Sequence, residues 1–147
     1  MISLLQMVAG VAKQLTDGTQ FMTNVKNQAE IVYHQYVMPP RPQSQAADVL
    51  PFCLVKAREF GLFPGRRQQI ELIYCLYNDD RTAAMTDMAT LTSLIEPLAV
   101  RGAPYAGWKL NEVKGFAGEP DTGVQPHPEY FLTVIMEFIG PPIKRSN

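Results

Sequence analysis

The sequence predicts an α+β protein, a mainly antiparallel β-sheet of four to five strands with two helices packed on it. Residues 50–56 and 68–78 are apolar segments joined by a short glycine-containing loop, a pattern typical of paired strands. A segment with helical spacing of apolar side chains follows and ends near Arg101. Residues 130–139 then form a further long strand that is almost entirely apolar on both faces, which indicates a central position in the sheet.

An amphipathic helix is expected near the start of the chain, over residues 2–16. Its apolar side chains recur at three- and four-residue steps and predict one buried stripe: Leu4, Leu5, Val8, Ala12 and Leu15. Gly18 is placed to end this helix. Residues 30–38 are rich in aromatic and β-branched side chains and predict a first strand. This strand should stop at Pro39, because proline cannot donate to a ladder.

The next segment, residues 39–48, contains three prolines and little apolar side-chain area, so we expect a mobile loop between two strands. Side chains alternate in the strand at 68–78, so that one of its faces is wholly apolar and the other is mixed. The wholly apolar face consists of Ile70, Leu72, Tyr74 and Leu76. We expect this face to meet the helices.

The second helix should begin after Asn78, Asp79 and Asp80, which offer a cap and negative charge at a helix N-terminus. Its apolar stripe repeats at close to the helical period: Ala84, Met88, Leu91, Ile95 and Leu98. Pro97 should bend or break the last turn, and Gly102 marks the end.

Two strands are expected in the last third of the chain. Residues 108–116 alternate irregularly and predict a strand, and residues 115–129 are filled with glycines and prolines and predict a long loop. The strand at 130–139 could pair with the strand at 108–116 as a long-looped hairpin. We therefore expect one domain over residues 1–142 and a short polar tail over 143–147.

The composition is that of an ordinary globular chain, with 147 residues, 46% hydrophobic and 18% charged. The formal net charge of -1 argues against a protein that binds DNA through its overall charge, since such affinity needs many Lys and Arg.

Cys53 and Cys75 fall in apolar strands and are interpreted as buried free thiols, although neighbouring strands could bring them close enough to pair. The opening segment shows no export signal or membrane anchor.

The search for chemistry returns no catalytic, cofactor-binding or metal site. His34 and His127 lack a second ligand at a spacing that metal binding favours, and each is interpreted as a structural histidine. No serine lies in a nucleophile elbow, and no GxGxxG or P-loop pattern occurs. Enzymatic activity therefore has no positive support. The enzyme or ligand-binding alternative predicts a deep pocket lined by His34, Cys53 or Cys75.

A basic and aromatic segment surrounds the loop between the strands at 50–56 and 68–78. Its basic members are Lys56, Arg58, Arg66 and Arg67, and its apolar members are Phe60, Leu62 and Phe63. Basic residues interleaved with aromatic ones can mark a nucleic-acid platform. The neutral net charge and the apolar side chains favour a protein interface instead.

The order of elements resembles the tail-terminator or tail-completion (neck, head-to-tail joining) proteins of long-tailed bacteriophages. The features that carry the resemblance are an N-terminal helix, a strand ending in a proline-rich loop, the Leu-Pro-Phe-x-Leu-Val strand at 50–55, the Gln-x-Glu-Leu-x-Tyr-x-Leu-Tyr strand at 69–77, a helix capped by Asp-Asp and a closing aromatic-rich strand. The segment Gln125-Pro-His-Pro-Glu-Tyr-Phe131 is similar to that family's loop of prolines and aromatics. The resemblance covers roughly residues 1 to 142.

This resemblance implies a structural protein of the virion neck, made in the host cytoplasm, that forms a ring, usually of six copies. Its partners would be other copies of itself, the tail tube protein and a head connector, and DNA would pass through the lumen without specific binding. The loops at 39–49, 57–66 and 115–129 would supply the contacts. Candidate interface residues are Arg41, Arg58, Phe60, Leu62, Phe63, Arg66, Arg67, Phe116, His127 and Tyr130. A head-side connector or stopper of the same neck is the nearest alternative.

Overall fold

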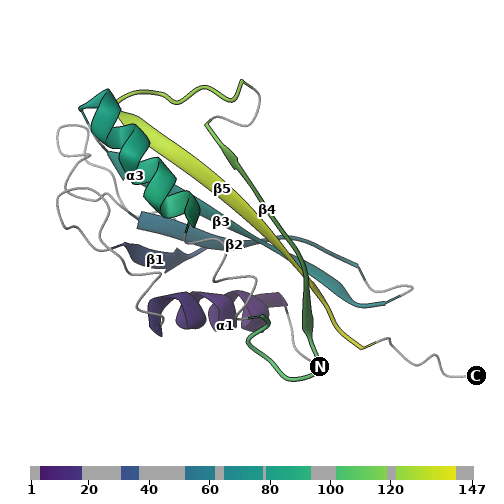
Figure 1. Ribbon diagram of the computed structural model, residues 1–147. Coiled ribbons are helices and arrows are strands. Elements are labelled where there is room, and N and C mark those ends of the chain that lie inside the picture. The colour runs from purple at the N-terminus through teal and green to yellow at the C-terminus, as the bar shows by residue number, and fades with distance from the viewer. Residues whose placement is uncertain are drawn as a thin grey trace, which may run out of the picture.

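The fold is a five-stranded sheet with two helices, seen in a computed structural model (Figure 1). The structure describes residues 4–17, 31–36, 52–61, 65–77, 79–93, 102–118 and 122–141. In chain order the elements are α1 (Leu4–Asp17), β1 (Val32–Gln35), β2 (Phe52–Gly61), β3 (Arg67–Tyr77), α3 (Arg81–Ser93), β4 (Lys109–Ala117) and β5 (Glu129–Ile139). The predicted α+β class, with a mainly antiparallel sheet and two helices, is confirmed.

The strands lie in the order β1-β2-β3-β5-β4. β1 runs parallel to β2, and the other three pairs are antiparallel. β5 occupies the central position expected from its apolar sequence, because it pairs with β3 on one side and with β4 on the other. The predicted hairpin of the last two strands is confirmed, with Phe116 opposite Thr133 in its register.

The main core lies between the helices and one face of the sheet. Ile70, Leu72, Tyr74 and Leu76 belong to this core together with side chains of both helices, which confirms that the wholly apolar face of β3 meets the helices. The stripe of α1 is made of Met7, Val8, Val11, Ala12 and Leu15. Leu5, predicted to belong to this stripe, is instead exposed, because it lies at the margin of the stripe on the first helical turn.

The second helix begins as its sequence predicts. Asp80 Oδ1 accepts hydrogen bonds from the backbone N–H groups of Thr82 at 2.9 Å and Ala83 at 3.2 Å, which is an N-cap. The stripe of Ala84, Met88 and Leu91 is buried in the main core. The predicted later members, Ile95 and Leu98, and the bend at Pro97 lie outside the described residues.

The strand ends differ from those predicted. β1 ends beside Tyr36, whose φ of 66° takes the backbone out of the extended region, rather than at the prolines that follow. β2 continues to Gly61 and β4 to Ala117, so the predicted loops at 57–66 and 115–129 are shorter than expected. Backbone pairing to β3 and β5 carries these segments on as strand despite their charged or small side chains. The proposed loop at 39–49 lies outside the described residues.

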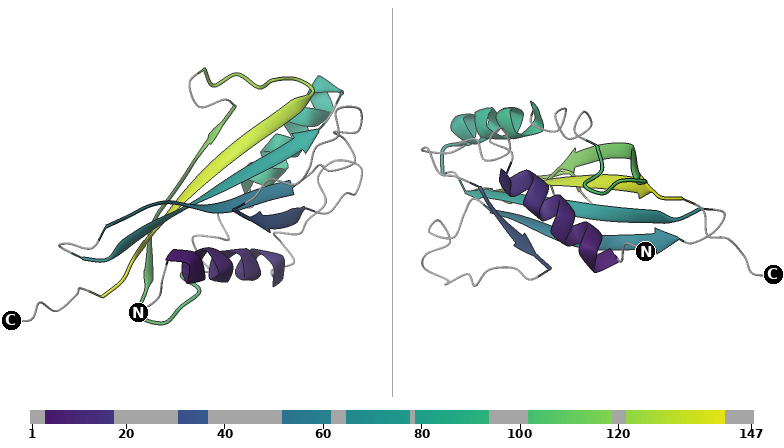
Figure 2. Two further views of the ribbon diagram at one scale, coloured as in Figure 1. Left: turned by 180° about the vertical axis from the view of Figure 1, so that it is seen from behind. Right: turned by 90° about the horizontal axis from the view of Figure 1, so that it is seen from below.

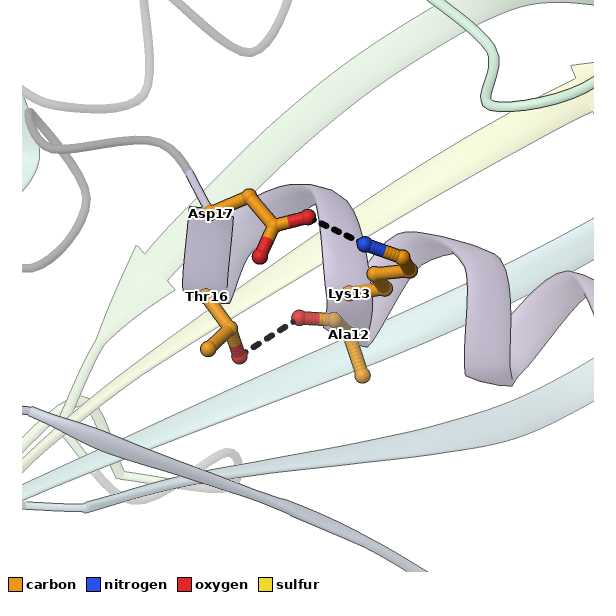
Figure 3. Close-up of polar contacts among 4 residues, drawn as sticks. All are labelled: Ala12, Lys13, Thr16 and Asp17. Atoms are coloured by element: carbon orange, nitrogen blue, oxygen red, sulfur yellow. Dashed lines mark hydrogen bonds and ion pairs between the residues drawn. The ribbon is translucent and has the colours of Figure 1, made fainter.

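Two polar contacts lie in the last turns of α1, as Figure 3 shows. Lys13 Nζ and Asp17 Oδ2 form an ion pair at 2.5 Å across one helical turn, and Thr16 Oγ1 donates to the Ala12 carbonyl oxygen at 2.8 Å. The hydrogen bond to Asp17 and the charge of Asp17 raise the pKa of Lys13. Exposed pairs of this type add little to stability, so the pair marks a solvated surface.

Candidate protein-binding surface

The β2–β3 hairpin forms an arm that reaches beyond both helices (Figures 1 and 2). Phe60 lies opposite Gln68 and Gly61 opposite Arg67 in its ladder, so the arm is paired to its end. The register shifts between Ala57 and Glu59, which leaves Arg58 as the extra residue of a β-bulge. A bulge increases local twist and re-aims the side chains beyond it, so this one sets the direction of the tip.

Among the described residues, the tip of the arm presents an aromatic side chain and several arginines. Phe60 is 63% exposed. Arg58 and Arg67 are exposed, and Arg66 Nε is buried without a hydrogen-bond partner in the described part of the chain. A buried guanidinium nitrogen that lacks an acceptor costs free energy, so Arg66 is held at some cost to stability. We call Phe60, Arg66 and Arg67 the arm tip.

Lys56 is the remaining basic residue of the predicted segment, and an ion pair within the sheet keeps it out of the arm tip. Its Nζ lies 3.3 Å from Glu71 Oε1 on the neighbouring strand, and the Glu71 side chain is only 15% exposed. The two residues are direct partners in the β2–β3 register, so the pair is a cross-strand interaction. Lys56 therefore serves the sheet rather than the tip.

A cavity of about 520 Å³ opens on the sheet face opposite the main core. It is lined by Arg58, Glu71, Ile73, Phe116, Gly118, Phe131 and Thr133. The register places Phe116 beside Thr133 and Thr133 beside Ile73, and with Arg58 of β2 the lining crosses four neighbouring strands. Its apolar side chains are Ile73, Phe116 and Phe131.

A polar network fixes the sheet beneath the arm. Gln69 Nε2 donates to Glu137 Oε2 at 3.0 Å, and Asn111 Nδ2 donates to Glu137 Oε1 at 2.9 Å. These two hydrogen bonds, with smaller contributions from the positive charges of Arg67 and Lys114, lower the pKa of the Glu137 carboxyl. The carboxylate ties β3, β5 and β4 together, so the arm is supported by a cross-linked sheet.

The structure separates the predicted interface residues into groups. Phe60, Arg66 and Arg67 lie at the arm tip, Phe116 lies on the cavity, and Arg58 lies between the two and lines the cavity as well. His127 Nδ1 contacts the Tyr130 hydroxyl, but Tyr130 is only 3% exposed and packs in the main core. The Tyr130 ring is therefore not part of a surface that a partner can reach. Arg41, Leu62 and Phe63 lie outside the described residues. That the accessible residues bind a partner stays a prediction.

Sequence reasoning did not identify Ile73, Phe131 and Thr133 as neighbours on one surface. Ile73 stands on the mixed face of β3, and Phe131 and Thr133 alternate with the core residues of β5. The alternation signalled a second face, but the strand order that joins these residues came only with the structure.

The residues that an enzyme alternative requires are dispersed. Cys53 belongs to the main core, whereas Cys75 packs with Phe52 on the opposite side of the sheet, and neither cysteine forms a disulfide. Burial raises the pKa of Cys53 well above its usual range, which disfavours the reactive thiolate. The His34 ring packs edge-on against Phe52, with ring centroids 5.9 Å apart. Each of these residues thus has a packing role.

Two further properties concern the described ranges alone. No group of three or more His, Cys, Asp and Glu side chains there is arranged to hold a metal ion. None of the helices found there combines the length and the apolar composition that a membrane crossing requires.

Comparison with known proteins finds similarity to solved structures. No protein-family model matches the sequence, and no curated protein matches it. The chain is similar to a chain in a solved structure titled "Virion of native gene transfer agent (GTA) particle", at 12% sequence identity and a TM-score of 0.45. The alignment covers 91% of this chain and 93% of that chain.

Proposed function

We propose that this chain is a structural virion assembly protein of a phage-type particle. In this role it caps the tail tube as an oligomeric ring, stops tube polymerisation and provides the surface to which the head attaches. The observation that carries the proposal is the arm tip, where the β2–β3 ladder runs as far as Gly61 and Arg67 and presents an exposed Phe60. Aromatic and arginine side chains are the residues most enriched at the centres of protein interfaces.

The order of elements supports this proposal. The described chain runs helix, strand, two long strands, helix and two closing strands, which is the order that the sequence resemblance implies. The Asp80 cap of α3 and the central, aromatic-rich β5 are two of the features on which that resemblance rests. The role needs no catalytic group, and the proposal assigns none.

A ring subunit must bind its neighbours, the tube below and the connector above, and this chain offers separate surfaces for such contacts. The arm tip projects past the helices, whereas the 520 Å³ cavity opens on the sheet face opposite the main core. Both stand on a sheet that the Glu137 network cross-links. Rigid support reduces the ordering cost of association, so such surfaces suit a closed assembly.

The lumen of the ring would carry DNA without reading its sequence. A net charge of -1 fits this passive passage, because strong phosphate binding would need a clear excess of Lys and Arg. The proposal therefore expects weak DNA affinity at physiological salt, comparable to non-specific binding.

The test uses purified protein mixed with polymerising tail tube protein, followed by negative-stain electron microscopy. We expect tubes of limited length with extra density at one end, and overlong tubes when the protein is omitted. Phe60→Ser should reduce capping, whereas Leu5→Ser, an equally exposed apolar change on α1, should leave it intact. Binding to the head connector but not to the tube would favour the head-side stopper instead. Binding to neither partner would overturn the proposal.

A further inference from the structure

The two ends of β3 carry opposite charge. At its start lie the exposed guanidinium groups of Arg58 and Arg67 together with Arg66, opposed there by Glu59. Just after its end lie the exposed side chains of Asp79 and Asp80 beside the exposed Arg81, so acidic side chains outnumber basic ones there. The strand has 11 residues, so roughly 35 Å of rigid sheet separates the basic end from the acidic end.

Among the described residues, each end also shows a large exposed apolar side chain. At the basic end this is Phe60. At the acidic end it is Met85, which is 51% exposed on α3 about one turn beyond the Asp80 cap. We call Asp79, Asp80 and Met85 the acidic end. The chain therefore displays two surfaces of opposite net charge, each with a large exposed apolar side chain, at the two ends of one strand.

We propose that the arm tip of one copy docks on the acidic end of the next copy. The inference rests on the proposed function, because it names the contact through which that ring would close. Phe60 packs against Met85, a favourable sulfur–aromatic contact, and the arginines bind the carboxylates of Asp79 and Asp80.

Such a contact is heterologous, since a copy gives its tip to one neighbour and its acidic end to the other. Heterologous contacts produce a ring when the rotation between copies closes, and an open filament when it does not. The contact joins charges across an exposed surface, so salt should weaken it. A second copy is the chosen occupant because the complementary charges and the complementary apolar side chain occur on the same chain.

The experiment uses two variants of the full chain, each altered at one end. The tip variant carries Phe60→Ser and Arg67→Glu, and the acidic-end variant carries Asp79→Lys and Met85→Ser. Asp80 is left unchanged because it caps α3. Leu5→Ser on α1 is the matched control, and circular dichroism confirms that every variant is folded. Association is measured by analytical ultracentrifugation across salt concentrations and by electron microscopy.

We expect the wild type and Leu5→Ser to self-associate, more weakly as salt rises, and each end variant to associate at least about tenfold less tightly. An equimolar mixture of the two variants should form one-to-one pairs, because the intact tip of one meets the intact acidic end of the other. Misfolding could not produce this complementation. A monomeric wild type, end variants that assemble normally, or a mixture that stays monomeric would each overturn the proposed contact.

Capping of tail tubes is scored in parallel, so that the two proposals fail in different ways. If the end variants still form rings and cap tubes, the contact is wrong and the proposed function stands. If wild-type rings form through the two ends but bind no tube protein, the contact stands and the proposed function fails. Binding of the arm tip to an acidic surface of the tube protein alone counts against the second-copy contact.

Discussion

Gly118 lies against the backbone of Gly123, so closely that a Cβ atom on Gly118 would stand 2.5 Å from the Gly123 carbonyl carbon and oxygen. Gly118 has a φ of 83°, and its N–H donates to the Phe131 carbonyl oxygen at 3.0 Å just beyond the end of β4. Gly118 also lines the cavity on the sheet face opposite the main core. One residue without a side chain thus holds the β4–β5 connection closed and shapes a candidate binding surface.

Gly118→Ala should destabilise the protein by roughly 2–4 kcal/mol, because the substitution adds a left-handed backbone penalty and a collision with backbone that cannot rotate away. Gly107→Ala is the matched control, since Gly107 has a similar φ of 86° but open space around its Cβ position. The control should cost only about 1–2 kcal/mol. Chemical denaturation measures both. Equal losses for the two variants would show that the contact with Gly123 is unimportant.

Asp80 and Asp79 offer a test of the helix cap. Asp80→Ala removes the acceptor of two backbone hydrogen bonds at the start of α3 and should cost about 0.5–2 kcal/mol. Asp80→Asn should retain most of that stability, because asparagine caps as well as aspartate does. Asp79→Ala, a change at the exposed neighbouring residue, should stay within about 0.5 kcal/mol. The midpoint of urea unfolding measures the stability of each variant. An Asp80→Asn variant as unstable as Asp80→Ala would mean that the negative charge of Asp80, and not its capping hydrogen bonds, stabilises the helix.

The sequence located the strands of the sheet better than it located their ends. The alternation in residues 68–78 identified β3 and its core face correctly, because a half-buried strand repeats every two residues. The end of β2 was placed too early, since Arg58 and Glu59 look like a turn. The structure shows that Arg58 is a bulge residue within a continuing ladder. A bulge interrupts alternation without ending a strand, and single-sequence patterns cannot distinguish the two cases.

The candidate site was predictable only where its residues are neighbours in sequence. Arg58, Phe60, Arg66 and Arg67 surround one turn, so sequence alone could group them. The cavity joins Phe116 to Ile73 through the strand between them, and that grouping depends on a strand order set by tertiary packing. Tyr130 was included among the interface candidates because it follows a proline-rich loop. Its position in the alternation of β5 places it in the core instead.

Glu137 should make part of the stability depend on pH. The hydrogen bonds from Gln69 and Asn111 lower its folded pKa, so its contribution is present above the ordinary glutamate pKa of about 4.3 and is lost as pH falls toward the folded value. Glu137→Gln should reduce stability at neutral pH and flatten the decline on acidification. Asn111→Ala, which removes one of the two donors, should flatten it partly. Urea unfolding at several pH values measures the slope, and an unchanged slope in both variants would contradict this assignment.

Cys53 and Cys75 should resist thiol reagents until the protein unfolds. Both side chains are buried, and burial raises the pKa of Cys53, so the thiolate that reacts is scarce and inaccessible. For a domain of ordinary stability, native labelling should be about 1,000-fold slower or more than labelling in denaturant. The single variants Cys53→Ala and Cys75→Ala assign the residual rate to one thiol.

Oxidation tests the separation of the same two cysteines across the sheet. Their side chains belong to clusters on opposite faces, so a mild oxidant should produce no intramolecular disulfide in the folded protein, even though β2 and β3 are neighbours. In denaturant the same oxidant should cross-link the two thiols, because the chain can then bring them together. Mass spectrometry after alkylation measures both states. Rapid labelling or cross-linking under native conditions would mean that the β2–β3 pairing opens readily, and the arm would then lack the rigidity on which its proposed docking role depends.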